Sequence, residues 1–308
     1  MDEVKQRLVG VSGLRGSEIG LGTATWGAVT DATEAGAILD RFLGAGGTLI
    51  DSSPAYAQGR SERVLGQVLA GGVDRSSLIL TSASGVDPHS PVGRRVDCSR
   101  RRLMLQLDTT LGNLGTDHLD VWSVGYWDER TPPAEVVDTL DWAVRTGRTR
   151  YAGVRGYAGW QLAVTSAAAT PGRALVATQN EYSLLVRDVE EELLPAARHL
   201  GVGMFAAAPL AQGVLTGRYR SGMPPGARTE AQTYLGTKAH TVVEALSTAA
   251  DGLDRSPAVV ALAWIRDRPG VSSAIVGAST AGQLTQLLTV TDTILPRAIG
   301  KALDDVSR

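Results

Sequence analysis

Residues 46–70 read GGTLIDSSPAYAQGRSERVLGQVLA, and this stretch contains the unit from which the fold is built. Gly47–Asp51 is a short apolar run, typical of a strand that is buried on both faces of a parallel sheet. Arg60–Ala70 carries its apolar side chains at helical spacing. The stretch therefore predicts a strand, a polar connection and an amphipathic helix.

The same alternation continues on both sides of this unit. Further strand-like runs lie at Gly20–Thr25, Leu78–Thr81, Leu119–Val124, Tyr151–Val154, Leu175–Gln179, Gly203–Ala207 and Ser273–Val276. Helix-like runs lie between them at Ala32–Ala45, Ser99–Leu114, Pro133–Thr146, Trp160–Ala168, Glu190–His199, Lys238–Leu253, Pro257–Arg268 and Ala281–Val290. The opening segment Gln6–Ile19 is broken by glycines and predicts a small hairpin.

Eight strand–helix repeats leave two α/β architectures, an open doubly wound sheet and a closed barrel. Gly20-Leu21-Gly22 is followed by Thr23 rather than by the pattern of a dinucleotide-binding turn, which favours the barrel. We predict a (β/α)8 TIM barrel with a short N-terminal β-hairpin, formed by residues 1–308 as a single domain. The irregular stretch Arg218–Thr237 is either a lid over the catalytic face or a disordered insertion.

The composition excludes several classes of function. A net charge of −2 offers no positive field for nucleic acid or an anionic membrane, and no apolar run has the length of a membrane span. The N-terminus does not resemble a signal peptide, and Cys98 is the only cysteine, which fits a cytoplasmic protein without disulfides. The four histidines lack metal-ligand spacing, so no metal is expected. Arginine far exceeds lysine, and Ala and Gly are abundant, which suggests a bacterial, GC-rich source.

Polar residues that follow the strand at Gly47–Asp51 resemble a family signature. Asp51 precedes Tyr56 by five positions, and Gly59-Arg60-Ser61-Glu62 leads into the helix, as in the aldo-keto reductases. Further matches lie at 20–23, 114–120, 147–153, 179–183, 209–217 and 261–264. The resemblance covers nearly the whole chain and implies a (β/α)8 barrel, NADPH as the hydride donor, and a catalytic tetrad of Asp, Tyr, Lys and His.

The tetrad is incomplete in this sequence. By the resemblance, Tyr56 is the proton donor, and a nearby lysine lowers the pKa of such a phenol. Asp51 and Tyr56 match their positions, but we expect Ser82 in place of the lysine and Gly125 in place of the histidine. Tyr56 is either a catalytic acid or a packed aromatic without chemistry.

The positions that the resemblance assigns to NADPH are altered as well. Arg155-Gly156 replaces the Ser-Asn pair that binds the nicotinamide amide, and Ala207 precedes Ala208-Pro209-Leu210 where an aromatic ring is expected. No basic residue for the 2′-phosphate follows the last strand. The positions that remain for a cofactor are Gly22, Thr23, Gln179, Leu210, Gln212, Gly277, Ser279, Thr280 and Gln283. We expect NADPH binding that is weak or absent.

Arg155 is the residue that we expect to carry new chemistry. Strands four and five of a barrel adjoin, so Arg155 lies where Gly125 leaves space, and it becomes a partner for Asp51. Its guanidinium would favour the phenolate of Tyr56, hold a carboxylate or enolate through paired N–H donors, and obstruct a nicotinamide ring. The alternative is that Arg155 points to solvent and pairs with Asp128 or Glu181.

Two tryptophans complete the candidate pocket. Trp26 and Trp127 lie on barrel loops, where they either wall a substrate pocket together with Ser82 and Gly125 or pack in the core.

The sequence is compatible with three functions. The favoured function is non-redox acid–base chemistry (dehydration, isomerisation or cyclisation) on a small carbonyl-containing or enolisable metabolite, by Tyr56, Asp51 and Arg155. The alternatives are an NADPH-dependent carbonyl reductase with a modified tetrad, and a non-catalytic barrel that binds a ligand or a partner. A drifted reductase site in a bacterial chain suits specialised metabolism.

Overall fold

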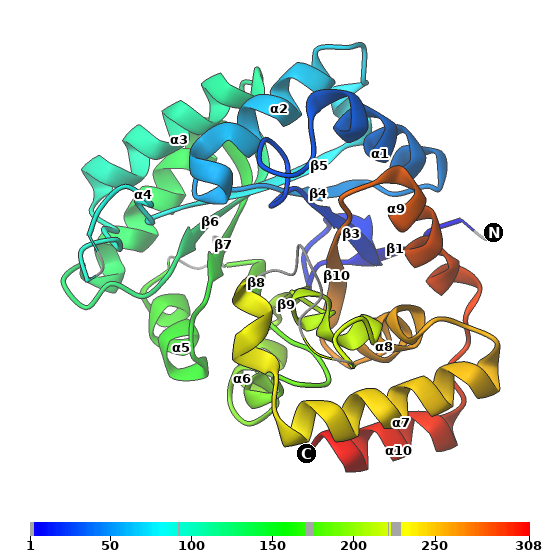
Figure 1. Ribbon diagram of the computed structural model, residues 1–308. Helices are drawn as coiled ribbons and strands as arrows, with labels where there is room; N and C mark the ends of the chain where they lie inside the picture. The colour runs from blue at the N-terminus through cyan, green and yellow to red at the C-terminus, as the bar shows by residue number, and fades with distance from the viewer. Residues whose placement is uncertain (1–2, 92, 170–174, 221, 223–228) are drawn as a thin grey trace.

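The computed structural model describes residues 3–91, 93–169, 175–220, 222 and 229–308. Eight parallel strands close into a barrel in the order β10-β3-β4-β5-β6-β7-β8-β9 (Figure 1). The barrel strands are β3 (Ile19–Gly22), β4 (Leu49–Asp51), β5 (Ile79–Ser84), β6 (Leu119–Gly125), β7 (Thr149–Arg155), β8 (Ala177–Glu181), β9 (Gly203–Ala207) and β10 (Val271–Gly277). The predicted (β/α)8 barrel is confirmed.

Helices surround the barrel as an outer ring (Figure 1). They are α1 (Ala32–Gly44), α2 (Arg60–Leu69), α3 (Arg100–Leu114), α4 (Pro133–Arg145), α5 (Gly159–Ala168), α6 (Leu193–Leu200), α7 (Thr237–Leu253), α8 (Pro257–Arg266), α9 (Ala281–Leu288) and α10 (Arg297–Ser307). Short 3₁₀ segments connect them: η1 (Tyr56–Gly59), η2 (Arg75–Ser77), η3 (Asp188–Glu190), η4 (Ala211–Thr216), η5 (Thr229–Tyr234) and η6 (Thr289–Asp292).

The strand alternation divides the apolar residues into two cores. Outward side chains of the strands pack against the helices in the larger core, which includes Trp122 and Val124. Inward side chains fill the amino-terminal part of the barrel, among them Leu49, Val121 and Phe205. At the carboxyl ends, the inward positions become polar or small, starting with Asp51. The carboxyl end of the barrel, which we call its mouth, is therefore lined by polar or small residues, and apolar side chains fill the interior below it.

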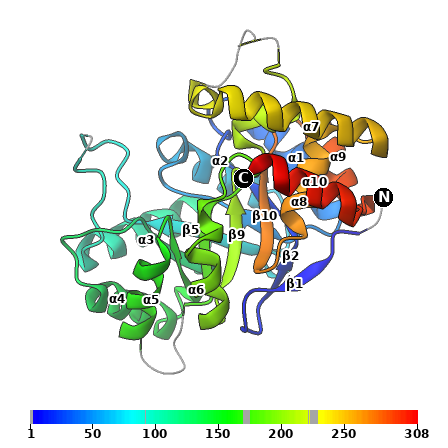
Figure 2. The ribbon, with the colours of Figure 1, turned by 90° about the horizontal axis from the view of Figure 1, so that it is seen from below.

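The predicted N-terminal hairpin is confirmed and covers the opposite end of the barrel. β1 (Gln6–Leu8) and β2 (Arg15–Ser17) pair antiparallel. Val9 and Leu14 in the turn region join the inner core. Figure 2 shows the hairpin at the end of the barrel away from the carboxyl ends of the strands. Because this end is closed, a site for a ligand belongs at the other.

Several boundaries differ from the expectations. The first barrel strand ends at Gly22 rather than Thr25, and the helix expected from Glu190 begins at Leu193 after η3. The helix α10 was not predicted. It packs along α7 (Figure 1), and its Asp304 accepts hydrogen bonds from Arg268 and from Trp264 Nε1.

The long irregular stretch that was predicted between Arg218 and Thr237 is described only in part. Residues 221 and 223–228 lie outside the described residues. The part that follows forms η5, whose Tyr234 hydroxyl donates a hydrogen bond to Glu181 at the carboxyl end of β8. This contact ties the end of the stretch to the mouth of the barrel.

Candidate active site

Three polar side chains meet at the mouth of the barrel. Arg155 at the end of β7 donates from Nη2 to Asp51 Oδ1 at the end of β4, over 2.6 Å. The Tyr56 hydroxyl, at the start of η1, donates to Asp51 Oδ2 over 2.9 Å. A longer contact of 3.4 Å runs from Arg155 Nη1 to the Tyr56 oxygen. We refer to Asp51, Tyr56 and Arg155 as the mouth triad.

The expected pairing of Asp51 with Arg155 is confirmed, and the solvent-facing alternative is wrong. The side chain of Asp51 is 1% exposed and that of Arg155 is 10% exposed. Burial alone would lower the pKa of Arg155, but the adjacent Asp51 carboxylate and Tyr56 raise it, so the guanidinium stays charged. Asp128 instead bonds Thr131 and the Cys98 N–H, and Glu181 bonds Tyr234.

The expected effect on Tyr56 is contradicted. Burial raises the pKa of Tyr56 and the negative charge of Asp51 raises it further, which outweighs the lowering by Arg155. The phenol therefore stays protonated at neutral pH. Nη2 of Arg155 donates to Asp51 and Nη1 contacts the Tyr56 oxygen, so the guanidinium is oriented within the triad.

Glycine at position 125 makes room for the arginine. A Cβ atom on Gly125 would lie 3.2 Å from Cβ of Arg155 and 3.7 Å from its Cγ and Cδ. The stem of Arg155 therefore crosses the space that a larger side chain at position 125 would fill. The predicted vacancy at Gly125 is present, and Arg155 occupies it.

A second glycine, Gly156, makes room for the large side chain of Tyr126 in the same way. A Cβ atom on Gly156 would lie 2.2 Å from Cδ1 of Tyr126, so the ring rests directly on the glycine backbone. Gly156 also has a φ of 68°, which L side chains rarely adopt. Tyr126 is 49% exposed and sits close enough to influence the ionisation of both Arg155 and Tyr56. Sequence reasoning missed Tyr126, because only its contact with a distant glycine places it here.

The assignment of Ser82 to the lysine position and the pocket is wrong. Asp51 pairs in register with Thr81, so Thr81 and Ala83 face inward and Ser82 faces outward. The Ser82 hydroxyl donates to Glu62 Oε1 over 3.1 Å behind the barrel wall. Ala83 is therefore the inward residue of β5 nearest the mouth, and it supplies no charge. Counting alternation from Asp51 would have found it.

The positions for a nicotinamide do not fit that group. The guanidinium of Arg155 occupies the mouth, and Gly156, which the resemblance places at an amide-binding position, is covered by Tyr126. Ala207 ends β9 without a ring for stacking. Gln179, which the resemblance assigns to the same amide, is 3% exposed, and its Oε1 has no hydrogen-bond partner.

The positions for a nucleotide phosphate are engaged within the protein. The Ser279 N–H donates to Gln283 Oε1, and Thr280 caps α9 by accepting from the Gln283 N–H. A carboxylate oxygen of Glu34, on α1, accepts from the Ala281 N–H at the first residue of α9 over 2.6 Å. A helix N-terminus attracts anions, but here a carboxylate already binds there and would repel a phosphate.

The remaining cofactor positions lie around the mouth. Gly22 and Gly277 pair in register, and a Cβ on Gly277 would meet nothing closer than 4.0 Å. The Thr23 hydroxyl donates to the Asp51 carbonyl and contacts Ser61. Leu210 precedes η4, and Gln212 lies within it at a positive φ.

The two tryptophans do not form an open pocket wall. Trp26 has no exposed surface and belongs to the larger core, so its placement in the pocket is wrong. Trp127 turns towards the start of α5, where it packs edge-on against Tyr157 and Trp160 at centroid distances of 5.6 and 5.1 Å. Tyr126 is the aromatic residue of this loop that lies beside Arg155.

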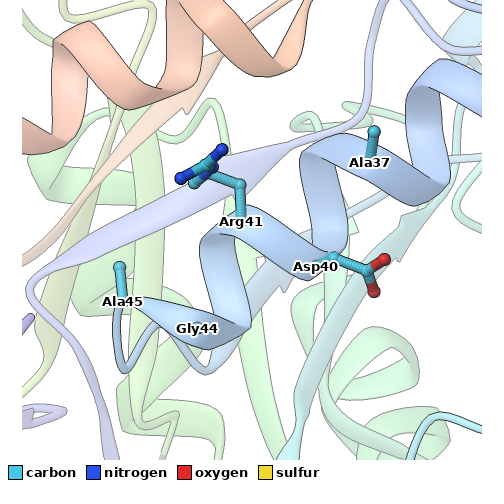
Figure 3. Close-up of a pocket in the computed structure, with 5 residues that line it drawn as sticks. All are labelled: Ala37, Asp40, Arg41, Gly44 and Ala45. Carbon is cyan, nitrogen blue, oxygen red and sulfur yellow. The ribbon is translucent and has the colours of Figure 1, made fainter.

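A hollow elsewhere on the surface lies on α1 (Figure 3). It is lined by Ala37, Asp40, Arg41, Gly44 and Ala45, all from that helix and its end. Its side chains diverge rather than converge on one point (Figure 3). The hollow therefore presents no constellation comparable with the mouth triad.

The comparison with protein families matches residues 18–308 to the aldo/keto reductase family. The chain belongs to this family. Members usually bind NADPH and act on small molecules. Among the described residues, no group of His, Cys, Asp or Glu could hold a metal ion.

Relatives extend over nearly the whole chain. The chain is 33% identical to "Uncharacterized oxidoreductase YrpG" of Bacillus subtilis, over 97% of this chain and 94% of the relative. It is 31% identical to "Probable voltage-gated potassium channel subunit beta" of Oryza sativa subsp. japonica, with the same coverage. A putative subunit of the same kind in Schizosaccharomyces pombe is 29% identical, over 97% and 92%. In the described part of this chain, no helix has the length and apolarity to cross a membrane.

The buried side chain of Glu62, which Ser82 contacts from the outer face of β5, leads to a prediction about stability. Its carboxylate is fully buried and accepts hydrogen bonds from the neutral side chains Ser82, Thr110 and Asn113. Burial raises the pKa of Glu62, so its stabilising contribution is complete below the unfolded-state pKa of about 4.3 and is lost as pH rises through the folded pKa.

The free energy of unfolding of the wild type minus that of Glu62→Gln should therefore fall as pH rises from 4 to 8. Each pH unit by which folding raises the pKa of Glu62 contributes about 1.4 kcal/mol to this difference. Urea unfolding at several pH values measures this difference, in which titrations common to both proteins cancel. A difference that is constant or rises with pH contradicts the account.

Proposed function

We propose that this member of the family catalyses non-redox proton transfer on a small carbonyl-containing or enolisable metabolite. The observation that carries the proposal is the mouth triad, in which an acid and a carboxylate share one hydrogen bond beside a fixed guanidinium. Such a pair supplies both partners of acid–base catalysis without a hydride donor. The reactions of this class are isomerisation, dehydration and cyclisation.

Each residue of the triad has a defined task in this proposal. Tyr56 stays protonated and donates its O–H to the carbonyl oxygen of the substrate. Asp51 Oδ2, released from that hydrogen bond, accepts the proton from the α-carbon, so the C–H bond breaks as the enol O–H forms. Arg155 holds Asp51 in place through the 2.6 Å ion pair and stabilises negative charge that develops on the oxygen.

The family relationship also supports a second candidate, a reductase with a modified site. One relative is named an oxidoreductase, and the family usually binds NADPH. We propose that NADPH binds weakly or not at all here, because Arg155, Tyr126 and Glu34 occupy or oppose the positions that its two ends require. A third candidate, a non-catalytic barrel that binds a ligand or partner, predicts no turnover of any kind.

The first test is hydrogen–deuterium exchange at the α-carbon of small enolisable ketones such as cyclohexanone, followed by NMR in D₂O without NADPH. The wild type should accelerate exchange, and Tyr56→Phe and Asp51→Asn should each lose roughly 100-fold or more. Arg155→Lys should also be impaired, because an ammonium cannot bond both partners as the planar fork does.

Tyr151→Phe is the matched control, since it removes a phenol hydroxyl from the amino-terminal part of β7, away from the triad. It should keep the exchange rate. Exchange that survives Tyr56→Phe, or that appears only when NADPH is added, contradicts the proposed chemistry.

The second test is titration with NADPH, followed by quenching of tryptophan fluorescence. The dissociation constant should be weaker than roughly 100 µM, which corresponds to about 5.5 kcal/mol of binding free energy. Glu34→Gln removes the carboxylate from the N-terminus of α9 and should tighten NADPH several-fold while leaving NADH unchanged. Micromolar binding by the wild type would favour the reductase candidate.

A further inference from the structure

The exposed face of α5 carries no charge. Trp160 is 51% exposed and Val164 is 45% exposed, and the two side chains lie one helical turn apart on the same face. Ala163 and Ala167 are exposed beside them. Residues 159–168 include no Asp, Glu, Lys or Arg, so the exposed side chains of this helix form an apolar strip. We call these four residues the α5 strip.

The helices on either side of α5 expose charged residues instead. α4 exposes Asp138 and Arg145, and α6 exposes Arg198 and His199 in its last turn. Both helices pack along α5, which lies between them in the outer ring (Figure 1). A contiguous apolar surface between charged neighbours is typical of a surface that another molecule covers.

Trp160 is the largest side chain of the α5 strip, and it is held from behind. Its ring packs edge-on against Trp127 at a centroid distance of 5.1 Å, and Trp127 packs against the buried Tyr157. A tryptophan that is fixed on one side and exposed on the other suits the centre of an interface, because little side-chain entropy is lost when it is covered. Ala163 and Ala167 are small, so a second helix can approach the backbone of α5 closely.

The charges beside the strip are divided along the helix direction. Glu191 and Glu192 are exposed before the start of α6, and Glu192 packs on Gly159 at the start of α5. Arg198 in α6 and Arg145 in α4 lie in the last turns of their helices. Because helices between parallel barrel strands all run in the same direction, acidic residues flank the start of α5 and basic residues flank its end.

This division determines how a second copy of the chain fits the strip. A two-fold axis that crosses α5 at right angles makes the two α5 helices antiparallel, so the acidic end of each copy meets the basic end of the other. A parallel arrangement would bring the acidic ends together, which is unfavourable. In the antiparallel arrangement the large Trp160 of each copy lies over the small Ala167 of the other. The strip is thus complementary to itself in shape and in charge.

We propose that this protein forms a symmetric dimer through α5, with the two-fold axis between Ala163 and Val164. Glu192 of each copy then faces the end of α6 that carries Arg198 in the other copy. A helix of ten residues is about 15 Å long, so with the ends of its neighbours it makes an interface at the small end of the usual range. We therefore expect a dissociation constant in the micromolar range. The dimer does not depend on the proposed function.

The first test is sedimentation velocity of the full chain at concentrations across the micromolar range. The wild type should pass from monomer to dimer. Trp160→Glu and Val164→Glu each place two carboxylates near the axis and should weaken association roughly tenfold or more. Leu105→Glu is the matched control, since it makes the same kind of change at a side chain of α3 that is 49% exposed, and it should leave association unchanged.

The second test is an exchange of charges, which identifies the orientation of the two copies. Glu192→Lys should weaken the dimer because it brings two basic ends together, and Arg198→Glu should weaken it because it brings two acidic ends together. The double variant restores opposite charges at both contacts and should recover the association of the wild type. Thermal unfolding of each variant verifies that it is folded.

Three results would each overturn the proposal: a wild type that is monomeric at every concentration, a dimer that survives Trp160→Glu, or a double charge variant that associates no better than the single ones. A monomeric wild type that binds phosphatidylcholine vesicles, and loses this binding on Trp160→Glu, would assign the α5 strip to a lipid surface instead.

Discussion

The ion pair between Arg155 and Asp51 is the constraint on which the site depends. It runs across the barrel mouth from β7 to β4 and joins two buried side chains. A buried guanidinium requires a carboxylate partner and space for its stem, and Asp51 and Gly125 provide them. Tyr56 then takes the second carboxylate oxygen, and its pKa rises rather than falls. The chemistry open to the site follows from these linked contacts.

Much of the fold could be predicted because the strands are short, apolar and regularly separated by helices. The helix α10 was missed although Ile299, Leu303 and Val306 recur at helical spacing. Its docking depends on Asp304, which bonds Arg268 and Trp264, residues distant in sequence. The pairing of Asp51 with Arg155 was one of two alternatives that the sequence offered, favoured by strand order and by the small Gly125 next to Arg155. The error at Ser82 came from ignoring strand alternation, which the register with Asp51 makes explicit. Tyr126 and Glu34 depend on tertiary neighbours that no local pattern reveals.

Large and small residues are complementary at two adjacent strand ends of the site. Gly125-Tyr126 at the end of β6 lies beside Arg155-Gly156 at the end of β7, and each glycine accommodates the large residue of the other pair. The scaffold that carries these two strand ends is the closed barrel of the aldo/keto reductase family. The acid–base chemistry that we propose for this mouth therefore rests on these contacts and not on the names of the relatives.

The most direct test of the central claim is a double-mutant cycle between Asp51→Asn and Arg155→Gln, with the free energy of unfolding measured in denaturant. Each single change leaves one buried charge without its partner and should cost about 3–5 kcal/mol. The double variant should be more stable than the sum of the single effects predicts, with a coupling of about 2 kcal/mol or more. Additive effects, within about 0.5 kcal/mol, would show that the pair does not organise the mouth of the barrel.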